Sequence, residues 1–115
     1  MSQEKGSGLT AIDAKNKVDN HMSGKDKKTF VILFHASFCG HCTEFMPAFD
    51  AACQKVNSSE IYKMNEEEAL NKIGQALMRE VSAPGFPTLV KFKNGKKVMY
   101  TGDRSVKSVE AFLKE

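Results

Sequence analysis

No stretch of this 115-residue chain approaches the roughly 18 apolar residues that a membrane span requires. The opening residues, 1–8, are polar, whereas a secretory signal contains an apolar segment of roughly 7–15 residues. The last four residues, Phe112–Glu115, are not an endoplasmic-reticulum retention tetrapeptide. We therefore expect the chain as given to remain cytoplasmic. A secretory compartment is expected only if a signal has been removed.

An excess of charge of one sign is also missing, since 17 Lys and Arg face 14 Asp and Glu for a formal net charge of +3. Nucleic-acid binding usually requires a basic face or stripe. We therefore expect a solvated surface of mixed charge, with neither nucleic acid nor membrane as a partner. The length suits one domain. We predict a flexible tail over residues 1–8, a single domain over residues 9–115, and a monomer.

Cysteine is scarce: the chain has only three, and an odd number does not suit a scaffold held together by several disulfides. Two of them, Cys39 and Cys42, form a C-x-x-C pair, which in this composition is typical of a catalytic or metal-binding site. A structural zinc site needs four ligands, usually two separated pairs. Even with His35 and His41 only one such pair exists, so we expect no metal. Cys53 is expected in the core, with a second disulfide or a link between chains as the alternative.

Hydrophobic periodicity predicts an alternation of helices and strands. Pro47 falls inside the second helix and should kink it, and Asn57–Ser59 should end it. Asn94-Gly95 favours a tight hairpin, because both residues accept positive φ. A helix between the first two strands makes them parallel, so we predict an α/β fold whose mixed sheet carries helices on both faces. The expected helices are 9–22, 40–56, 66–81 and 106–113, and the expected strands are 29–35, 61–64, 88–92 and 97–101.

The segment Phe38-Cys39-Gly40-His41-Cys42 lies where the first predicted strand passes into a helix. At a helix start the first sulfur faces unpaired backbone N–H groups and the positive end of the dipole, which favour a thiolate. Because only a thiolate attacks a disulfide, Cys39 is predicted to be the exposed nucleophile and Cys42 the resolving thiol. Protonated His41 would stabilise the reduced form, which makes the oxidised form a better oxidant. The segment predicts disulfide donation or isomerisation more than general reduction.

From about Thr29 to Glu115 the chain resembles the thioredoxin fold, and within it the catalytic domains of protein disulfide isomerases. The stretch Cys39–Cys42 is identical to the isomerase active-site tetrapeptide, and Pro47 matches the family's helix-kinking proline. Gly85–Thr88 resembles the loop whose proline is cis and lies against the dithiol. Phe92–Gly95 matches the family hairpin. Tyr100–Arg104 is similar to the isomerases' Tyr-x-Gly-x-Arg.

The resemblance implies a thioredoxin-like mixed β-sheet flanked by helices, and a protein disulfide isomerase or protein-disulfide oxidoreductase. Phe86, before cis Pro87, would offer its backbone to an extended substrate, beside Phe38 and Gly40. Arg104 would swing in and lower the pKa of the resolving cysteine. The resemblance implies no cofactor beyond the Cys39–Cys42 redox-active disulfide. The implied partners are cysteine-containing proteins and a thiol/disulfide electron partner such as glutathione.

Two positions depart from the family pattern. Phe38 replaces the usual tryptophan, and Leu33 replaces a buried acid that accepts the proton of the resolving cysteine. The lysine that normally pairs with this acid remains as Lys63, and an unpaired buried ammonium tends to lose its charge. We therefore predict that Lys63, or a water near it, takes the proton from Cys42. The alternative is that Lys63 extends to solvent.

A second class of function stays open from the sequence. The chain could be a thioredoxin-fold binding or redox-sensing module in which the dithiol reacts slowly or only incidentally, because fold alone does not decide function. The set of Cys39, His41, Cys42, Pro87 and Arg104 favours the enzyme, whereas Leu33 favours the module.

Overall fold

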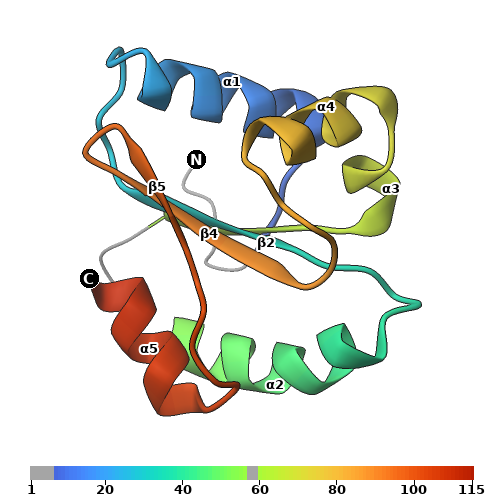
Figure 1. Cartoon of the computed structure of the whole chain (residues 1–115). Helices are drawn as coiled ribbons and strands as arrows, with labels where there is room; N and C mark the ends of the chain where they lie inside the picture. Colours follow the sequence, from blue (N-terminus) through green and yellow to red (C-terminus); the bar gives the residue numbers. More distant parts are fainter. Residues whose placement is uncertain (1–6, 57–59) are drawn as a thin grey trace.

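The computed structural model describes residues 7–56 and 60–115, so the helix end predicted at Asn57–Ser59 lies outside the described residues. The order of helices and strands agrees with the predicted α/β pattern (Figure 1). Within the described ranges, none of the helices combines the length and the apolar character needed to span a bilayer. The elements are β1 (Ser7–Gly8), α1 (Ala11–Met22), β2 (Phe30–Phe34), α2 (Gly40–Gln54), β3 (Glu60–Met64), α3 (Glu66–Ala69), α4 (Lys72–Glu80), β4 (Thr88–Lys93), β5 (Lys96–Met99) and α5 (Val106–Lys114).

The five strands form one mixed sheet in the order β1-β3-β2-β4-β5. β3 runs parallel to both β1 and β2, whereas β4 runs antiparallel to β2 and β5. All five residues of β2 are buried, as expected for a strand covered on both faces. In the middle of β2, Leu33 lies opposite Lys63 on β3 and Leu89 on β4. The buried central strand therefore leads directly into the segment that carries the cysteine pair.

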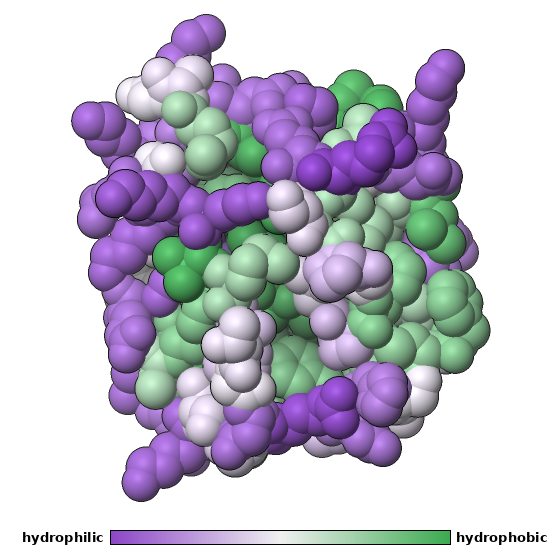
Figure 2. All heavy atoms as spheres, viewed as in Figure 1, coloured by the Kyte–Doolittle hydropathy of each residue, from purple (hydrophilic) through white to green (hydrophobic). Residues whose placement is uncertain are grey.

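Helices cover both faces of the sheet, with α1, α3 and α4 on one side and α2 and α5 on the other (Figure 1). One core lies under α1 and α4 and includes Val18, Phe34 and Leu77. The other lies under α2 and α5 and includes Leu33 and Phe49. In the same view, Figure 2 shows apolar side chains across the middle of the molecule, between polar side chains over the outer helices. This arrangement confirms the prediction of a mixed sheet between two helical layers.

The predicted flexible tail over residues 1–8 is wrong for its last two residues. Ser7 and Gly8 form β1 and pair in parallel with Tyr62 and Lys63 of β3. The pairing continues into the next residue, because the backbone N–H of Leu9 donates to the Lys63 carbonyl at 2.8 Å. The backbone groups along the edge of a sheet lack partners, and they can pair with an added strand whatever side chains the added strand carries. Hydropathy patterning therefore could not reveal this strand.

The single helix predicted over residues 66–81 is wrong, because the structure has two helices, α3 and α4, which the chain joins through a corner (Figure 1). Asn71 caps the second helix, since its side-chain Oδ1 accepts the backbone N–H of Gly74 at 2.7 Å. Gln75 Nε2 donates to the Leu70 carbonyl at 2.6 Å and so gives a hydrogen-bond partner to the carbonyl at the end of the first helix. Asn favours a cap over a helix interior, because its side chain competes for backbone N–H groups.

Gly74 allows this corner to close. A Cβ added there would collide with the carbonyl oxygen of Glu68 and lie 2.7 Å from the carbonyl of Ala69. We predict that Gly74→Ala lowers the free energy of unfolding by about 1–3 kcal/mol, as overpacking against a fixed backbone does. Urea denaturation measures this difference.

Gly40→Ala is the matched control, because a Cβ added at this other helical glycine meets no described atom within 4 Å. Its free energy of unfolding should stay unchanged or rise slightly, since Ala is the better helix former. A Gly74→Ala protein as stable as the wild type would contradict the packing argument.

Candidate functional site

The two cysteines of the C-x-x-C pair meet at the start of α2. Cys39 is the residue that caps this helix, and its sulfur accepts the backbone N–H of Cys42 at 3.1 Å. Both residues are free thiols. The first sulfur is half-buried, whereas the second belongs to a side chain only 2% exposed. Cys39 is therefore less exposed than the sequence predicted, because its sulfur packs against the helix start and the Phe86 carbonyl, whereas Cys42 lies inward as predicted.

The loop before β4 lies against the first sulfur. The peptide bond between Phe86 and Pro87 is cis, and the Cys39 thiol donates a weak hydrogen bond to the Phe86 carbonyl at 3.5 Å. The Phe38 side chain is 70% exposed and packs edge-to-face against the Phe86 ring, with the ring centroids 6.2 Å apart. Two aromatic rings, one exposed and one half-buried, thus flank the Cys39 sulfur.

The environment of Cys42 favours the neutral thiol. Burial raises the pKa of this thiol to about 11, and its hydrogen bond with Cys39 acts in the same direction. A hydrogen bond from the Ala36 backbone opposes the change, whereas the negative charge of Glu66 adds to it. At neutral pH Cys42 is therefore protonated and must lose a proton before it can attack a disulfide.

Other predicted site residues lie in the first turn of α2 and in the segment after β5. Gly40 and His41 are exposed in the first turn of α2. Arg104, in the segment after β5, donates from Nη1 to Glu44 Oε2 at 3.1 Å. Arg104 also lines a cavity of about 150 Å³ together with Pro87. The guanidinium thus lies near the cis-proline loop but is held by a carboxylate of α2.

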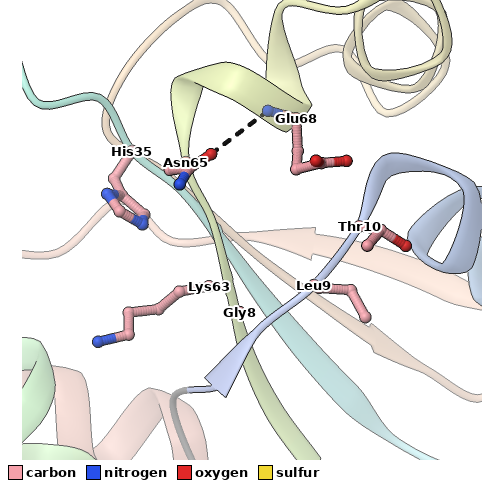
Figure 3. A pocket seen from close by; sticks show the side chains of 7 residues that line it. All are labelled: Gly8, Leu9, Thr10, His35, Lys63, Asn65 and Glu68. Carbon is pink, nitrogen blue, oxygen red and sulfur yellow. Dashed lines mark hydrogen bonds between the residues drawn. The ribbon is translucent and has the colours of Figure 1, made fainter.

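The expectation that Lys63 is an unpaired buried ammonium is wrong. Its Nζ lies 3.4 Å from Oδ1 of Asp50, a residue of α2, and a quarter of the Lys63 side chain is exposed. In Figure 3 the side chains of Lys63 and His35 lie to the same side of β3, away from Glu68 and Thr10. Because sequence periodicity shows only which helix face is polar, the pairing of Asp50 with Lys63 could not be predicted.

His35 is half-buried at the end of β2. Burial lowers the pKa of its imidazole, and the Lys63 ammonium adds to this effect, while the carboxylates of Glu66 and Asp50 oppose it. The ring is therefore neutral at physiological pH. Cys53 is buried in the core beneath α2, as expected.

Sequence reasoning missed the contact between Glu66 and Ser37. In the sequence, Glu66 is one of three acids in the first turn of a helix, where the positive end of the helix dipole favours negative charge. Its carboxylate instead accepts hydrogen bonds from the backbone N–H and the hydroxyl of Ser37, each at 2.8 Å. Ser37 lies two residues before Cys39, so this contact belongs to the same site. A carboxylate at the start of a helix was visible in the sequence, but its partner was not.

Comparison with known proteins places this geometry in context. A family model described as Thioredoxin matches residues 10–115. The chain is 31% identical over 109 residues to Bloodstream-specific protein 2 of Trypanosoma brucei brucei, covering 94% of this chain and 21% of that protein. It is 32% identical over 112 residues to the Probable protein disulfide-isomerase ER-60 of Schistosoma mansoni, covering 91% and 21%. The chain thus spans about a fifth of the length of these curated relatives.

Solved structures show the same fold. The first thioredoxin domain of mouse Protein disulfide-isomerase A4 is 26% identical, with a TM-score of 0.68 over 91% of this chain and 70% of that one. The reduced thioredoxin pre-protein of Schistosoma mansoni also has a TM-score of 0.68, at 23% identity, over 97% of both chains. The similarity to the second structure concerns the fold alone.

The raised pKa of Cys42 predicts a late titration step. The ultraviolet thiolate absorbance of the reduced wild-type protein, minus that of reduced Cys42→Ser, should rise with a midpoint near pH 11, above the ordinary thiol value of 9.0. Burial is the reason, because the charged form loses solvation. A midpoint at or below pH 9.0 would show that water reaches this sulfur.

Proposed function

This chain belongs to the thioredoxin family, and we propose that it is a thiol–disulfide oxidoreductase of the protein disulfide isomerase type. It acts on the cysteines of protein substrates through Cys39 and Cys42. One observation carries the proposal: the Cys39 sulfur caps α2, where the Cys42 N–H donates to it, and faces the Phe86 carbonyl beside cis Pro87. That arrangement leaves the first sulfur reactive and the second held in reserve.

The reaction proceeds in two exchanges. The Cys39 thiolate attacks one sulfur of a substrate disulfide, so an intermolecular disulfide forms and a substrate thiolate leaves. Cys42, once deprotonated, attacks the Cys39 sulfur, which releases the second substrate thiolate and forms the Cys39–Cys42 disulfide. The two electrons pass from the dithiol to the substrate. In reverse, the oxidised pair donates its disulfide, and glutathione serves as the electron partner.

Substrate contact falls to the apolar groups around the first sulfur. The exposed Phe38 ring and the half-buried Phe86 ring provide an apolar surface for an extended peptide. The Phe86 backbone, already within reach of Cys39, offers main-chain groups that pair with such a peptide as an added strand. Gly40, where an added Cβ meets open space, leaves the approach to the sulfur unobstructed.

Two exposed cations tune the reaction. His41, exposed next to Cys42, adds positive charge when protonated, which stabilises the reduced form and makes the disulfide form more oxidising. Arg104 assists the resolving step when it leaves Glu44, since a guanidinium near Cys42 favours the thiolate. Its ion pair with Glu44 is exposed and therefore weak enough to exchange.

A redox-sensing or binding module is the second candidate, and one observation favours it. The Cys42 thiol has a pKa of about 11, and Leu33 occupies the position of the acid that the family places beneath it. Slow loss of this proton would prolong the mixed disulfide at Cys39. A long-lived mixed disulfide suits a module that captures partners rather than an enzyme that releases them.

The reduction potential of the Cys39–Cys42 pair tests these alternatives. Equilibration with a glutathione series should give one two-electron couple near −180 mV, typical of protein disulfide isomerase. Cys53→Ser should leave it unchanged, and Cys39→Ser should abolish it. A value near −270 mV, as for thioredoxin, would indicate a reductase. A pair that does not cycle would contradict the enzyme and favour the binding module.

The predicted proton transfer near Lys63 has a separate test. Because Lys63 pairs with Asp50 as an ammonium, the proton acceptor is taken to be a water beside it, and Lys63→Met, which removes the polar group next to that water, should slow the release of a substrate trapped on Cys39 about tenfold. Lys63→Arg keeps the positive charge and hydrogen-bond donors beside Asp50, so it should release the substrate at close to the wild-type rate. The exposed Lys28→Met is the control. Unchanged release in Lys63→Met would remove Lys63 from the mechanism.

A further inference from the structure

We propose that Glu66 is a positioning residue for the Cys39–Cys42 dithiol. Through Ser37 its carboxylate holds the turn that precedes the nucleophile, and it places a negative charge beside the dithiol. The inference rests on the proposed thiol–disulfide exchange, and it assigns that site a residue outside the C-x-x-C motif and the cis-proline loop.

The contact has a geometry that fixes both groups. Glu66 Oε2 accepts the Ser37 backbone N–H at 2.8 Å, and Oε1 accepts the Ser37 hydroxyl at 2.8 Å. The same N–H also lies 3.3 Å from Oε1. Both carboxylate oxygens are therefore used on one residue, which restricts the Glu66 rotamer and the Ser37 backbone together. Hydrogen bonds to an ionised acceptor are roughly twice as strong as neutral ones.

The anchored residue lies inside the turn that delivers Cys39. The Cys39 N–H donates to the Ala36 carbonyl at 3.3 Å, which closes a turn around Ser37 and Phe38. One residue earlier, the His35 N–H donates to the Met64 carbonyl of β3 at 2.9 Å. The turn is thus attached to the β3–α3 segment at two points. Release of the Ser37 attachment would free Phe38 and Cys39 to move relative to Phe86.

The short helix α3, which carries Glu66, is held in place by contacts with two other helices. Glu68, in the same short helix, accepts the backbone N–H of Ala11 at 2.7 Å through Oε1. The end of that helix packs directly against Gly74, where no side chain would fit. Since contacts with α1 and α4 therefore hold α3 from two sides, the Glu66 carboxylate is a fixed attachment point for the β2–α2 connection.

The charge of Glu66 acts on the dithiol as well. Hydrogen bonds from the Ser37 backbone and hydroxyl lower the pKa of the Glu66 carboxyl, so it is ionised at neutral pH. This negative charge contributes to the raised pKa of Cys42. In the described part of the chain, Cys39 also acts on the Cys42 thiol, and Glu66 acts on the His35 imidazole together with the Lys63 ammonium and the Asp50 carboxylate.

The two effects have separable consequences. The negative charge disfavours the Cys42 thiolate and so lowers the acid dissociation constant of that thiol. Because Cys42 is protonated at neutral pH, this effect does not reach the reduction potential measured there. The anchor affects the rate of attack by Cys39 instead, because a nucleophile that is displaced from its productive position attacks more slowly. Removal of the charge alone should therefore change the acid dissociation constant of Cys42, and removal of the whole side chain should also change the rate of attack.

Two variants of the full chain test this separation. Glu66→Gln keeps an oxygen for Ser37 but loses the charge, and the acid dissociation constant of Cys42, read from the thiolate absorbance minus that of the same protein with Cys42→Ser, should rise about threefold. The shift should shrink at high ionic strength, because the contact is exposed. Glu66→Ala should show the same shift and, in addition, about tenfold slower attack of Cys39 on glutathione disulfide.

Glu67→Gln is the matched control, because this exposed neighbour carries the same charge in the same turn; it should leave the Cys42 dissociation constant and the rate of attack unchanged. Cys42 dissociation constants that agree among wild type, Glu66→Gln and Glu67→Gln, or an attack rate unchanged in Glu66→Ala, would overturn the assignment of Glu66. A wild-type pair that never forms its disulfide would overturn the proposed function, and this inference with it.

Discussion

The hydrogen bond from the Cys42 N–H to the Cys39 sulfur is the interaction on which the site depends. It exists because β2 is buried on both faces and ends at Phe34, which fixes where α2 begins. A helix start leaves backbone N–H groups without partners, and here a sulfur takes the place of the usual capping oxygen. The position of the Cys39 sulfur that caps α2 is thus the same position from which it would react.

The same helix start gives the two sulfurs opposite environments. Cys39, before the first turn, is half-buried and lies at the positive end of the dipole. Cys42, one turn later, points inward, and burial raises the pKa of its thiol to about 11. A spacing of three residues therefore separates the proposed nucleophile from the proposed resolving thiol. The order of the two exchanges proposed above follows from this difference in solvation.

The sequence predicted those features that depend on hydropathy or on the backbone preferences of two adjacent residues in a turn. The buried run of β2, the Asn94-Gly95 hairpin and the position of the C-x-x-C pair at a helix start all belong to this kind. It could not predict contacts made by backbone groups or by distant polar side chains. β1 pairs through its backbone, Asn71 ends a helix through one side-chain hydrogen bond, and Glu66 meets Ser37 across 29 positions of the chain.

The replacement of the family's buried acid by Leu33 explains why these distant contacts matter for the chemistry. With an apolar residue in the core beneath α2, no carboxylate on β2 can stabilise or receive the proton of Cys42. The carboxylates that the structure places around this region, Asp50 beside Lys63 and Glu66 beside Ser37, come from α2 and α3, and their contacts are exposed to solvent. Such exposed interactions are screened by salt, whereas a buried acid would be screened little. The redox behaviour of this domain should therefore respond to ionic strength more than that of a relative with the buried acid.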